Sequence, residues 1–221
     1  MTTGEKLYDA LMRLPIIAFN LYFLAKEASG IRQIVALHPY FGGDWLFLFT
    51  VTARVSIVMF LVTLICLFAS RYRPIRKYSS WDPKITALAG TLLPYLMLLG
   101  TRPSPSIPWD SLSTALLLTG NILAIVTVVA LGRSLSVMPE ARKLVTEGLY
   151  RRIRHPLYFA EEIAIIGVYM QFRSWQATII VIVHLYFQIR RMTWEEEILG
   201  RAFPAYGQYK LVTHRLIPGI Y

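Results

Sequence analysis

The most polar stretch of this chain holds residues that could bind an anion. The segment 148–158 (GLYRRIRHPLY) interrupts a sequence that is otherwise mostly apolar. Proline suits the first position of a helix, so the pattern predicts a helix that begins at Pro156 with its first N–H groups free. Anions are favoured at such a helix start, and a carboxylate or phosphate would be stabilised there. His155 adds a group that donates or accepts a hydrogen bond. The cations of the segment are Arg151, Arg152 and Arg154.

A second polar group follows about forty residues later and carries the opposite charge. Glu195 and Glu196 begin a run of glutamates and could hold hydroxyls or an ammonium group. Tyr206 and Tyr209 supply flat apolar area with a polar tip. A ligand with a carboxylate, an ammonium and a ribose diol would suit these two segments together. The simpler interpretation is that Arg191 and Glu195 form an i,i+4 ion pair and that the arginines contact lipid headgroups.

The composition indicates a membrane protein. The 221 residues are 55% hydrophobic and 16% charged, whereas a water-soluble domain carries about 25% charge. The formal net charge of +10 would suggest nucleic acid in a soluble protein. Here the basic residues lie in short loops between apolar runs, which is how membrane topology is encoded, so we expect no nucleic-acid partner. Cys66 cannot form an intrachain disulfide or a cysteine-based metal site, and we expect it to be buried.

The apolar runs predict an all-α fold, a polytopic bundle of about six membrane helices. A short amphipathic piece, Ile31–Leu37, and a turn at 38–43 are expected between the first two. We divide the chain into N-terminal transmembrane helices (1–110) and a C-terminal core (111–221). The predicted spans are 7–25, 45–70, 85–100, 111–132, 157–172 and 174–192.

Loop charges set the orientation. The loops 71–84 and 133–156 each carry four more basic than acidic residues, and the tail 190–221 carries two more. The loops 26–44 and 101–110 are neutral. Because positive loops stay in the cytoplasm, both termini and both polar segments are predicted to be cytoplasmic.

Some polar residues lie within the predicted spans. We expect Arg54 to snorkel toward the membrane surface or to pair structurally, and Asn121 to join two helices. Glu161 and Glu162 are costly in a membrane helix and are expected to pair with Arg54 or Arg190, or to act as a base. His184 is a further candidate base.

The order of the motifs resembles one family. Gly148, Tyr150 and the run Arg154-His155-Pro156-x-Tyr158 come first, and the second part joins Glu195 and Glu196 to four later residues. The later residues are Leu199, Phe203, Tyr206 and Tyr209. This combination resembles the isoprenylcysteine carboxyl methyltransferase family of membrane enzymes, and membrane-type phospholipid N-methyltransferases look similar. The resemblance runs from about Leu131 to the C-terminus. Pro204 departs from the pattern, where relatives commonly have glycine.

The resemblance implies a cytoplasmic S-adenosylmethionine site formed by the C-terminal helical hairpin and tail, with a lipid-like or prenylated substrate reaching it from the bilayer. No metal is implied. The residues it assigns to the cofactor are Tyr150, His155, Pro156, Tyr158, Glu196, Tyr206 and Tyr209. The candidate catalytic residues are Arg154, Arg191 and Glu195.

The methyl acceptor is left open. An arginine would orient a carboxylate nucleophile directly, whereas an amine or thiol would need a base. With Arg151, Arg152, Arg154, Arg190 and Arg191 expected to line the site, the charge favours the carboxylate of an isoprenylcysteine-type lipid. The alternatives are phospholipid or small-molecule N- or S-methylation and a non-catalytic lipid-binding protein. A sterol-type reductase shares the Arg-His-Pro theme but is larger and would need a nucleotide-phosphate loop.

Overall fold

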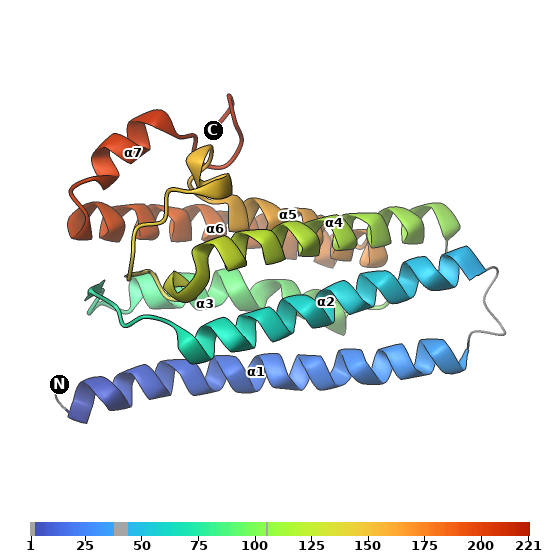
Figure 1. Ribbon diagram of the computed structural model, residues 1–221. Helices are drawn as coiled ribbons and strands as arrows, with labels where there is room; N and C mark the ends of the chain where they lie inside the picture. The colour runs from blue at the N-terminus through green and yellow to red at the C-terminus, as the bar shows by residue number, and fades with distance from the viewer. Residues whose placement is uncertain (1–2, 38–43, 105) are drawn as a thin grey trace.

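The computed structural model describes residues 3–37, 44–104 and 106–221, and they form a bundle of long helices (Figure 1). The helices of the first half are α1 (Thr3–Ala36), α2 (Asp44–Ser70) and α3 (Asp82–Leu92). The 3₁₀ helix η2 (Leu93–Leu99) continues α3. The second half contains α4 (Ile107–Leu131), α5 (Pro156–Phe172), α6 (Trp175–Ala202) and α7 (Tyr206–Val212). The all-α prediction is therefore confirmed.

Short elements close the loops at one end of the bundle. β1 (Arg76–Lys77) pairs antiparallel with β2 (Glu140–Ala141), so the two basic loops are joined. The 3₁₀ helices η3 (Gly132–Ser134) and η4 (Gly148–Arg151) lie in the second loop. Figure 1 shows both loops, the start of α1 and the C-terminal tail at the same end of the helices.

The first helix differs from the prediction. We expected a span at 7–25 and a separate piece at Ile31–Leu37, but α1 is one helix from Thr3 to Ala36. Pro15 lies inside it without ending it. Between residues 26 and 36, Gly30 is the residue that favours a helix least. It packs against the Arg54 guanidinium, and the helix continues through it. The turn predicted at 38–43 lies outside the described residues.

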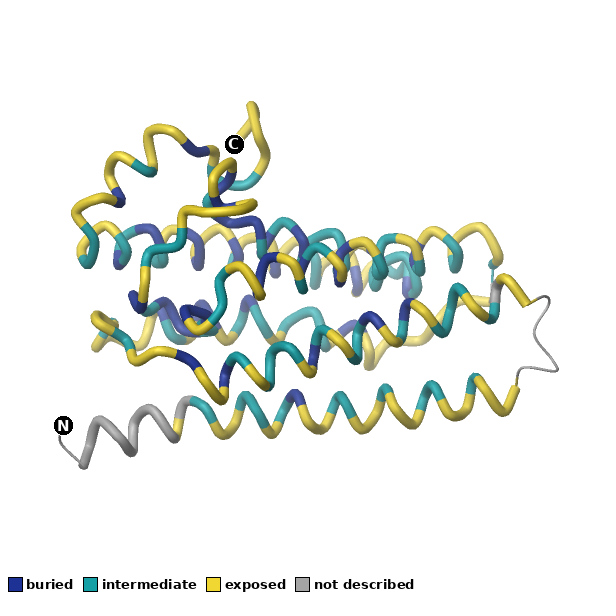
Figure 2. The backbone as a smooth tube through the Cα atoms, in the orientation of Figure 1, coloured by how far each residue is buried: buried dark blue, intermediate teal, exposed yellow. Residues whose placement is uncertain are grey.

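The outer surface of the bundle is apolar. Exposed positions follow the outside of the long helices (Figure 2), and large hydrophobic side chains such as Leu14, Leu48 and Met59 are among them. Cys66 is exposed on α2, so its predicted burial is wrong. Contiguous exposed apolar area of this kind suits contact with lipid. Among the described residues, Phe47–Ser70 and Ile107–Ser134 are helices long and apolar enough to cross a membrane. The six-span topology and the two-part division at residue 110 remain predictions.

Polar contacts between helices follow two of the predictions. Arg54 pairs with Glu27 at 2.9 Å, which confirms a structural role. Asn121 donates to Ser56 Oγ at 3.2 Å and joins α4 to α2, as expected. Each contact satisfies a polar group that would be costly against lipid.

The closest helix contact is between α4 and α5. A Cβ placed on Gly120 would lie 2.6 Å from the Ala164 backbone nitrogen, and one on Gly167 would lie 3.0 Å from the Ser113 carbonyl oxygen. Ser113 Oγ also donates to the Gly167 carbonyl at 2.7 Å. Small residues let the two backbones approach in this way. These contacts therefore hold residues 160–167 of α5 against α4.

Replacing Gly120 with alanine is expected to destabilise the bundle, because backbone atoms of α5 would have to move. We expect a loss of about 1–3 kcal/mol in the free energy of unfolding, typical of overpacking. Thermal unfolding in detergent measures it. Gly207→Ala is the control, since a Cβ there meets nothing within 4 Å. Equal melting temperatures for the two variants would contradict the close contact.

The topology is tested with reporter fusions. Ser106 lies in a neutral loop and Lys143 in a basic one, so the two are expected on opposite sides of the membrane, with Lys143 cytoplasmic. Accessibility of reporters fused at each position measures this. Two reporters on one side would contradict the six-span layout.

Candidate active site

The C-terminal tail lies directly against the loop that leads into α5. The Arg154 and His155 amides donate to the carbonyl oxygens of His214 and Arg215 at 2.8 and 3.1 Å. The His214 amide returns a bond to the Arg152 carbonyl at 3.1 Å. Residues 213–215 thus pair like a strand with residues 152–155, and the tail covers the start of α5.

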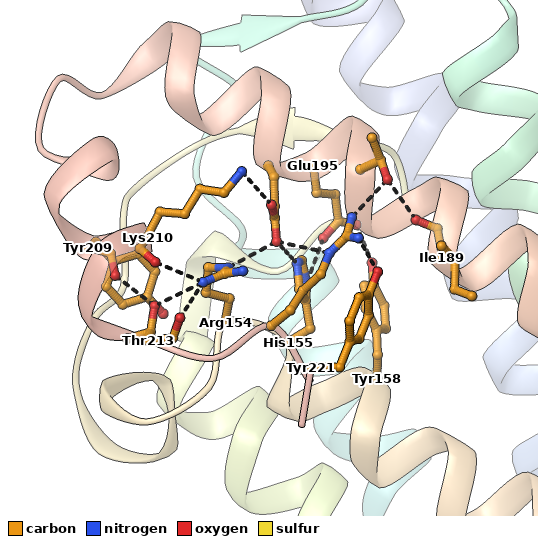
Figure 3. Close-up of polar contacts among 12 residues, drawn as sticks. Arg154, His155, Tyr158, Ile189, Glu195, Tyr209, Lys210, Thr213 and Tyr221 are labelled. Atoms are coloured by element: carbon orange, nitrogen blue, oxygen red, sulfur yellow. Dashed lines mark hydrogen bonds and ion pairs between the residues drawn. The ribbon is translucent and has the colours of Figure 1, made fainter. Parts of the chain in front are cut away.

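Glu196 on α6 is the centre of the polar contacts. Its Oε1 atom accepts hydrogen bonds from Arg154 Nε at 3.0 Å, His155 Nε2 at 3.2 Å and Arg215 Nε at 3.1 Å. Its Oε2 lies 3.3 Å from Lys210 Nζ. The Glu196 side chain is only 8% exposed. Figure 3 shows Arg154, His155 and Lys210 converging from the loop, the start of α5 and the tail. One carboxylate therefore joins three segments.

Glu195 makes a separate set of contacts one residue earlier. Arg191 Nε lies 3.4 Å from its Oε1, so the predicted i,i+4 pair is present. The Tyr158 hydroxyl donates to the same carboxylate (Figure 3). His155 stacks on the Tyr158 ring with 5.4 Å between centroids, and the Arg191 guanidinium lies over that ring at 4.8 Å. Glu197 points elsewhere and pairs with the exposed Arg201.

Arg191 is held by its surroundings as well as by Glu195. Its Nη1 donates to Thr91 Oγ1 at 3.3 Å and its Nη2 to the Val137 carbonyl at 3.0 Å. These partners come from α3 and from the loop after α4. A buried arginine held on three sides keeps a fixed position, which a group that orients a ligand requires.

A cavity of about 540 Å³ lies beside these contacts. Its lining includes polar side chains of α5, α6 and α7 and many apolar residues of α1, α2, α3 and η2. Apolar lining residues include Ile16, Phe19, Phe60, Leu64, Leu88 and Leu98. The volume is within the range of small-molecule sites, about 300–1,000 Å³. The cavity can thus take a ligand with a polar end and an apolar tail.

Most of the predicted site residues border this cavity. Those that do are Tyr150, Arg154, His155, Tyr158, Arg191, Glu195, Tyr206 and Tyr209. Glu196 pairs with two of them, Arg154 and His155, and Pro156 begins α5 as predicted. Tyr209 donates to the Tyr150 carbonyl at 2.7 Å, which ties α7 to η4.

Three of the expected cations are placed elsewhere. Arg151, Arg152 and Arg190 are exposed and do not border the cavity, and Arg190 lies over the Trp194 ring. Arg151 and Arg152 lie before the turn into α5, and Arg190 is on the opposite side of α6 from Gln188. The expectation that five arginines line the site is therefore wrong; Arg154 and Arg191 do, and each is paired with a glutamate.

The polar residues inside α5 and α6 also differ from expectation. Glu162 pairs with His184 at 2.8 Å, and Glu161 accepts a hydrogen bond from Gln188 at 3.2 Å. Pairing with Arg54 or Arg190 is therefore wrong. The spacing of one helix could not show which residue of the next helix lies opposite.

Two residues of the site were not predicted from the sequence. Arg215 contacts Glu196 from the segment after Tyr209, the last residue of the motif. Arg142 is buried at the cavity beside Glu140, within the loop that we treated only as a topology signal. The excess of basic residues in that loop was the only sequence signal for Arg142, and it does not distinguish a buried arginine from an exposed one.

The charges of the site set its protonation. Burial opposes ionisation of Glu196, but the hydrogen bonds and charges of His155, Arg154 and Arg215 outweigh it and hold the pKa of this carboxyl well below its usual value. Burial, then the charge of Glu196, raises the pKa of Tyr206. Burial likewise raises the pKa of Tyr209 to about 12. At neutral pH the site therefore holds a carboxylate and neutral phenols.

The comparison with known families defines the class of protein. Residues 110–206 match the phospholipid methyltransferase family, which covers the isoprenylcysteine carboxyl methyltransferase-like enzymes. This match confirms the resemblance drawn from the motifs. The family indicates a membrane methyltransferase. Tyr209 and the docked tail lie beyond the matched residues. No curated protein matches the chain.

The low pKa of Glu196 predicts how the site responds to acid. A carboxyl whose pKa is lowered by folding stabilises the folded state above its ordinary pKa, 4.5, and loses that contribution as the pH falls further. Wild type should therefore unfold at a higher temperature than Glu196→Gln at neutral pH, and the difference should shrink below pH 4.5. Thermal unfolding across pH measures this.

Glu197→Gln is the matched control for that experiment. Its ion pair with Arg201 is exposed and is expected to contribute little at any pH. A difference between wild type and Glu196→Gln that stays constant into strong acid would contradict the role given to the Glu196 charge.

Proposed function

We propose that this protein is an integral membrane, S-adenosylmethionine-dependent methyltransferase with a lipid-like acceptor. The observation that carries the proposal is one cavity whose lining combines the polar contacts of α5, α6 and α7 with apolar helix faces. A polar cofactor and an apolar acceptor tail could occupy it together. The basic loops at the polar end support a cytoplasmic site.

The residues at the polar end fit such a cofactor. Arg142 has buried Nε and Nη1 atoms that find no hydrogen-bond partner among the described residues, and so does the Tyr206 hydroxyl. Unpaired buried donors are costly and point to a ligand that supplies acceptors. A cofactor carboxylate would suit Arg142, and Tyr206 and Tyr209 would cover an aromatic ring. His155, Pro156 and Glu196 would then hold the start of α5 against the cofactor, with Tyr150 and Tyr158 beside it.

The protein's contribution to the reaction would be position and exclusion of water. The bound sulfonium supplies an activated methyl group, so the residues need only align the acceptor with it. Arg191 is fixed over Tyr158 and against Glu195, next to the apolar part of the cavity. Arg154, Arg191 and Glu195 are therefore proposed to orient the reacting groups. The docked tail would cover the site from the cytoplasm.

Two acceptor classes fit this arrangement. The carboxylate of an isoprenylcysteine-type lipid would be oriented by Arg191, which borders the cavity. The cations that favoured it are fewer than expected, because Arg151, Arg152 and Arg190 do not reach the cavity. A phospholipid amine is the second candidate, and the carboxylate of Glu161 at the cavity favours it. A non-catalytic lipid-binding role would need no cofactor.

The cofactor proposal is tested by direct binding. His155→Ala and Glu196→Gln should each weaken S-adenosylmethionine binding about ten-fold or more, which corresponds to about 1.4 kcal/mol. The reason is that both hold the start of α5 in place, with 3.2 Å between them. Calorimetry on detergent-purified protein measures the affinity, and thermal unfolding identifies variants that fail to fold.

Glu197→Gln serves as the control and should bind as wild type does, since that side chain pairs with Arg201 away from the cavity. Unchanged affinity in both folded site variants would remove these residues from the site. No binding by the wild-type protein would favour the non-catalytic role.

A further inference from the structure

An apolar patch lies on the outside of the tail, at the end of the bundle that carries the basic loops. Leu211 and Val212 on α7 are 80% and 77% exposed, and Ile220 is 81% exposed. Leu149 of η4 is exposed beside them. Figure 2 shows α7 and the tail as mostly exposed segments outside the long helices. Large apolar side chains exposed together mark a contact surface, and we call these four residues the tail patch.

The tail patch is held in a fixed position by the polar site. Arg154 Nη1 donates to the Lys210 carbonyl at 3.1 Å, directly before the two apolar residues of α7. Tyr209 donates to the Tyr150 carbonyl at 2.7 Å, which ties α7 to η4. Residues 213–215 pair with the chain that leads into α5. The apolar side chains of α7 and η4 therefore belong to one surface.

The charge around the tail patch is positive. Neither the segment 148–158 nor the segment 206–221 contains an acidic residue, and Glu147 is the nearest carboxylate along the loop. Arg151 and Arg152 are exposed and do not border the cavity. The Arg152 carbonyl accepts a hydrogen bond from the tail at 3.1 Å, so this residue lies beside it. Exposed apolar side chains next to cations are typical of segments that lie on an anionic membrane surface.

The tail patch lies at the level where α6 is expected to leave the membrane. Exposed apolar residues follow α6 as far as Ile189, and Arg190 then lies over the Trp194 ring. Tryptophan and arginine at the end of an apolar run mark the membrane–water interface. Lys210 Nζ lies 3.3 Å from Glu196, so α7 turns back from the end of α6 toward this level. The tail patch therefore continues the apolar outer surface of the bundle.

We infer that the tail patch, with Arg151 and Arg152, docks on the surface of an anionic bilayer. The apolar side chains insert among the headgroups, and the two arginines bind lipid phosphates. The cytoplasmic leaflet, the predicted side of this surface, is the one that carries anionic lipid. A second copy of the chain would bring the same cations together across a symmetric contact, and neutral lipid offers no net charge to match them.

Docking would hold the tail from its outer side. α7 also carries Tyr206 and Tyr209, which border the cavity, and Glu196 holds the same segment from the inner side through Lys210. The lipid surface and the buried carboxylate thus act on opposite faces of one cover. Docking requires no ligand in the cavity, so it is independent of the proposed function.

The test measures contact between α7 and lipid headgroups. A fluorescent label is attached at Val212→Cys in a chain that also carries Cys66→Ser, and the protein is placed in nanodiscs whose lipids bear a nitroxide on the headgroup. Quenching should be strong in discs rich in phosphatidylglycerol and weak in discs of phosphatidylcholine. Adding Arg151→Gln and Arg152→Gln should raise the phosphatidylglycerol fraction at half-maximal quenching about two-fold or more, because each cation near the surface adds attraction.

Two further label positions calibrate the depth. A label on the natural Cys66 thiol, which is exposed on α2, should be quenched by nitroxides on the acyl chains in both lipids. A label at Ala205→Cys, in the exposed turn before α7, should be quenched in neither. The reason is that α6 extends about 12 Å from Trp194 to its end at Ala202, beyond the interface.

A matched charge control uses the other basic loop. Arg76→Gln with Lys77→Gln also removes two exposed cations, from β1, which Figure 1 shows apart from α7. This pair should leave the quenching curve of the label at Val212→Cys unchanged.

The possible outcomes are distinct. Quenching at Val212→Cys that is absent from both lipids, or equal in both, would overturn the inference. So would an arginine-pair variant that behaves as its parent does, because charge would then not select the lipid. Energy transfer between labelled copies without lipid quenching would assign the tail patch to a second copy of the chain instead. The comparison of lipids uses one labelled protein, so it decides the question even where a further variant does not fold.

Discussion

The polar site depends on one buried carboxylate. One carboxylate oxygen of Glu196 contacts Arg154, His155 and Arg215, and the other contacts Lys210. These partners come from the loop, the start of α5 and the tail, which the backbone pairing of residues 213–215 also joins. Removing one member of a buried charge group leaves the others uncompensated, so the segments hold together or separate as a unit. The ionised Glu196 carboxylate therefore adds to the backbone pairing that holds the tail over the cavity.

The glycine contacts between α4 and α5 position the loop that leads to Arg154 and His155. Gly120 and Gly167 bring the two backbones together along most of α5. The loop 132–155 begins at the end of α4 and ends at Pro156, so both of its ends belong to one tightly packed pair. A loop anchored in this way can hold Tyr150 and His155 in fixed positions without much secondary structure of its own. The β1–β2 pairing adds a third attachment.

Sequence patterns correctly predicted the features that depend only on residues close together in the chain. The start of α5 at Pro156 and the Arg191–Glu195 pair follow from helix geometry alone, and both are present. The direction of a side chain depends on the neighbouring helix, and that information was missing. Thus charge alone suggested that Arg151 and Arg190 line the site, although both are exposed. The docking of residues 213–215 could not be predicted, because backbone pairing of so short a segment leaves no sequence pattern.

The distribution of charge at the cavity distinguishes Glu161 from Glu195 and Glu196. The carboxylates of Glu195 and Glu196 form ion pairs with Arg191, Arg154 and the tail, whereas Glu161 accepts a hydrogen bond from the Gln188 amide and feels the Arg191 charge without an ion pair to it. A sulfonium and an ammonium repel each other, so an amine must lose its proton before it can approach the methyl group. A carboxylate beside the amine lowers the cost of bringing in the cation and then receives the proton. A carboxylate acceptor would need neither, and Glu161 beside it would only oppose its approach. Glu161, which borders the cavity, therefore suits an acceptor that arrives as a cation and must lose a proton before it reacts.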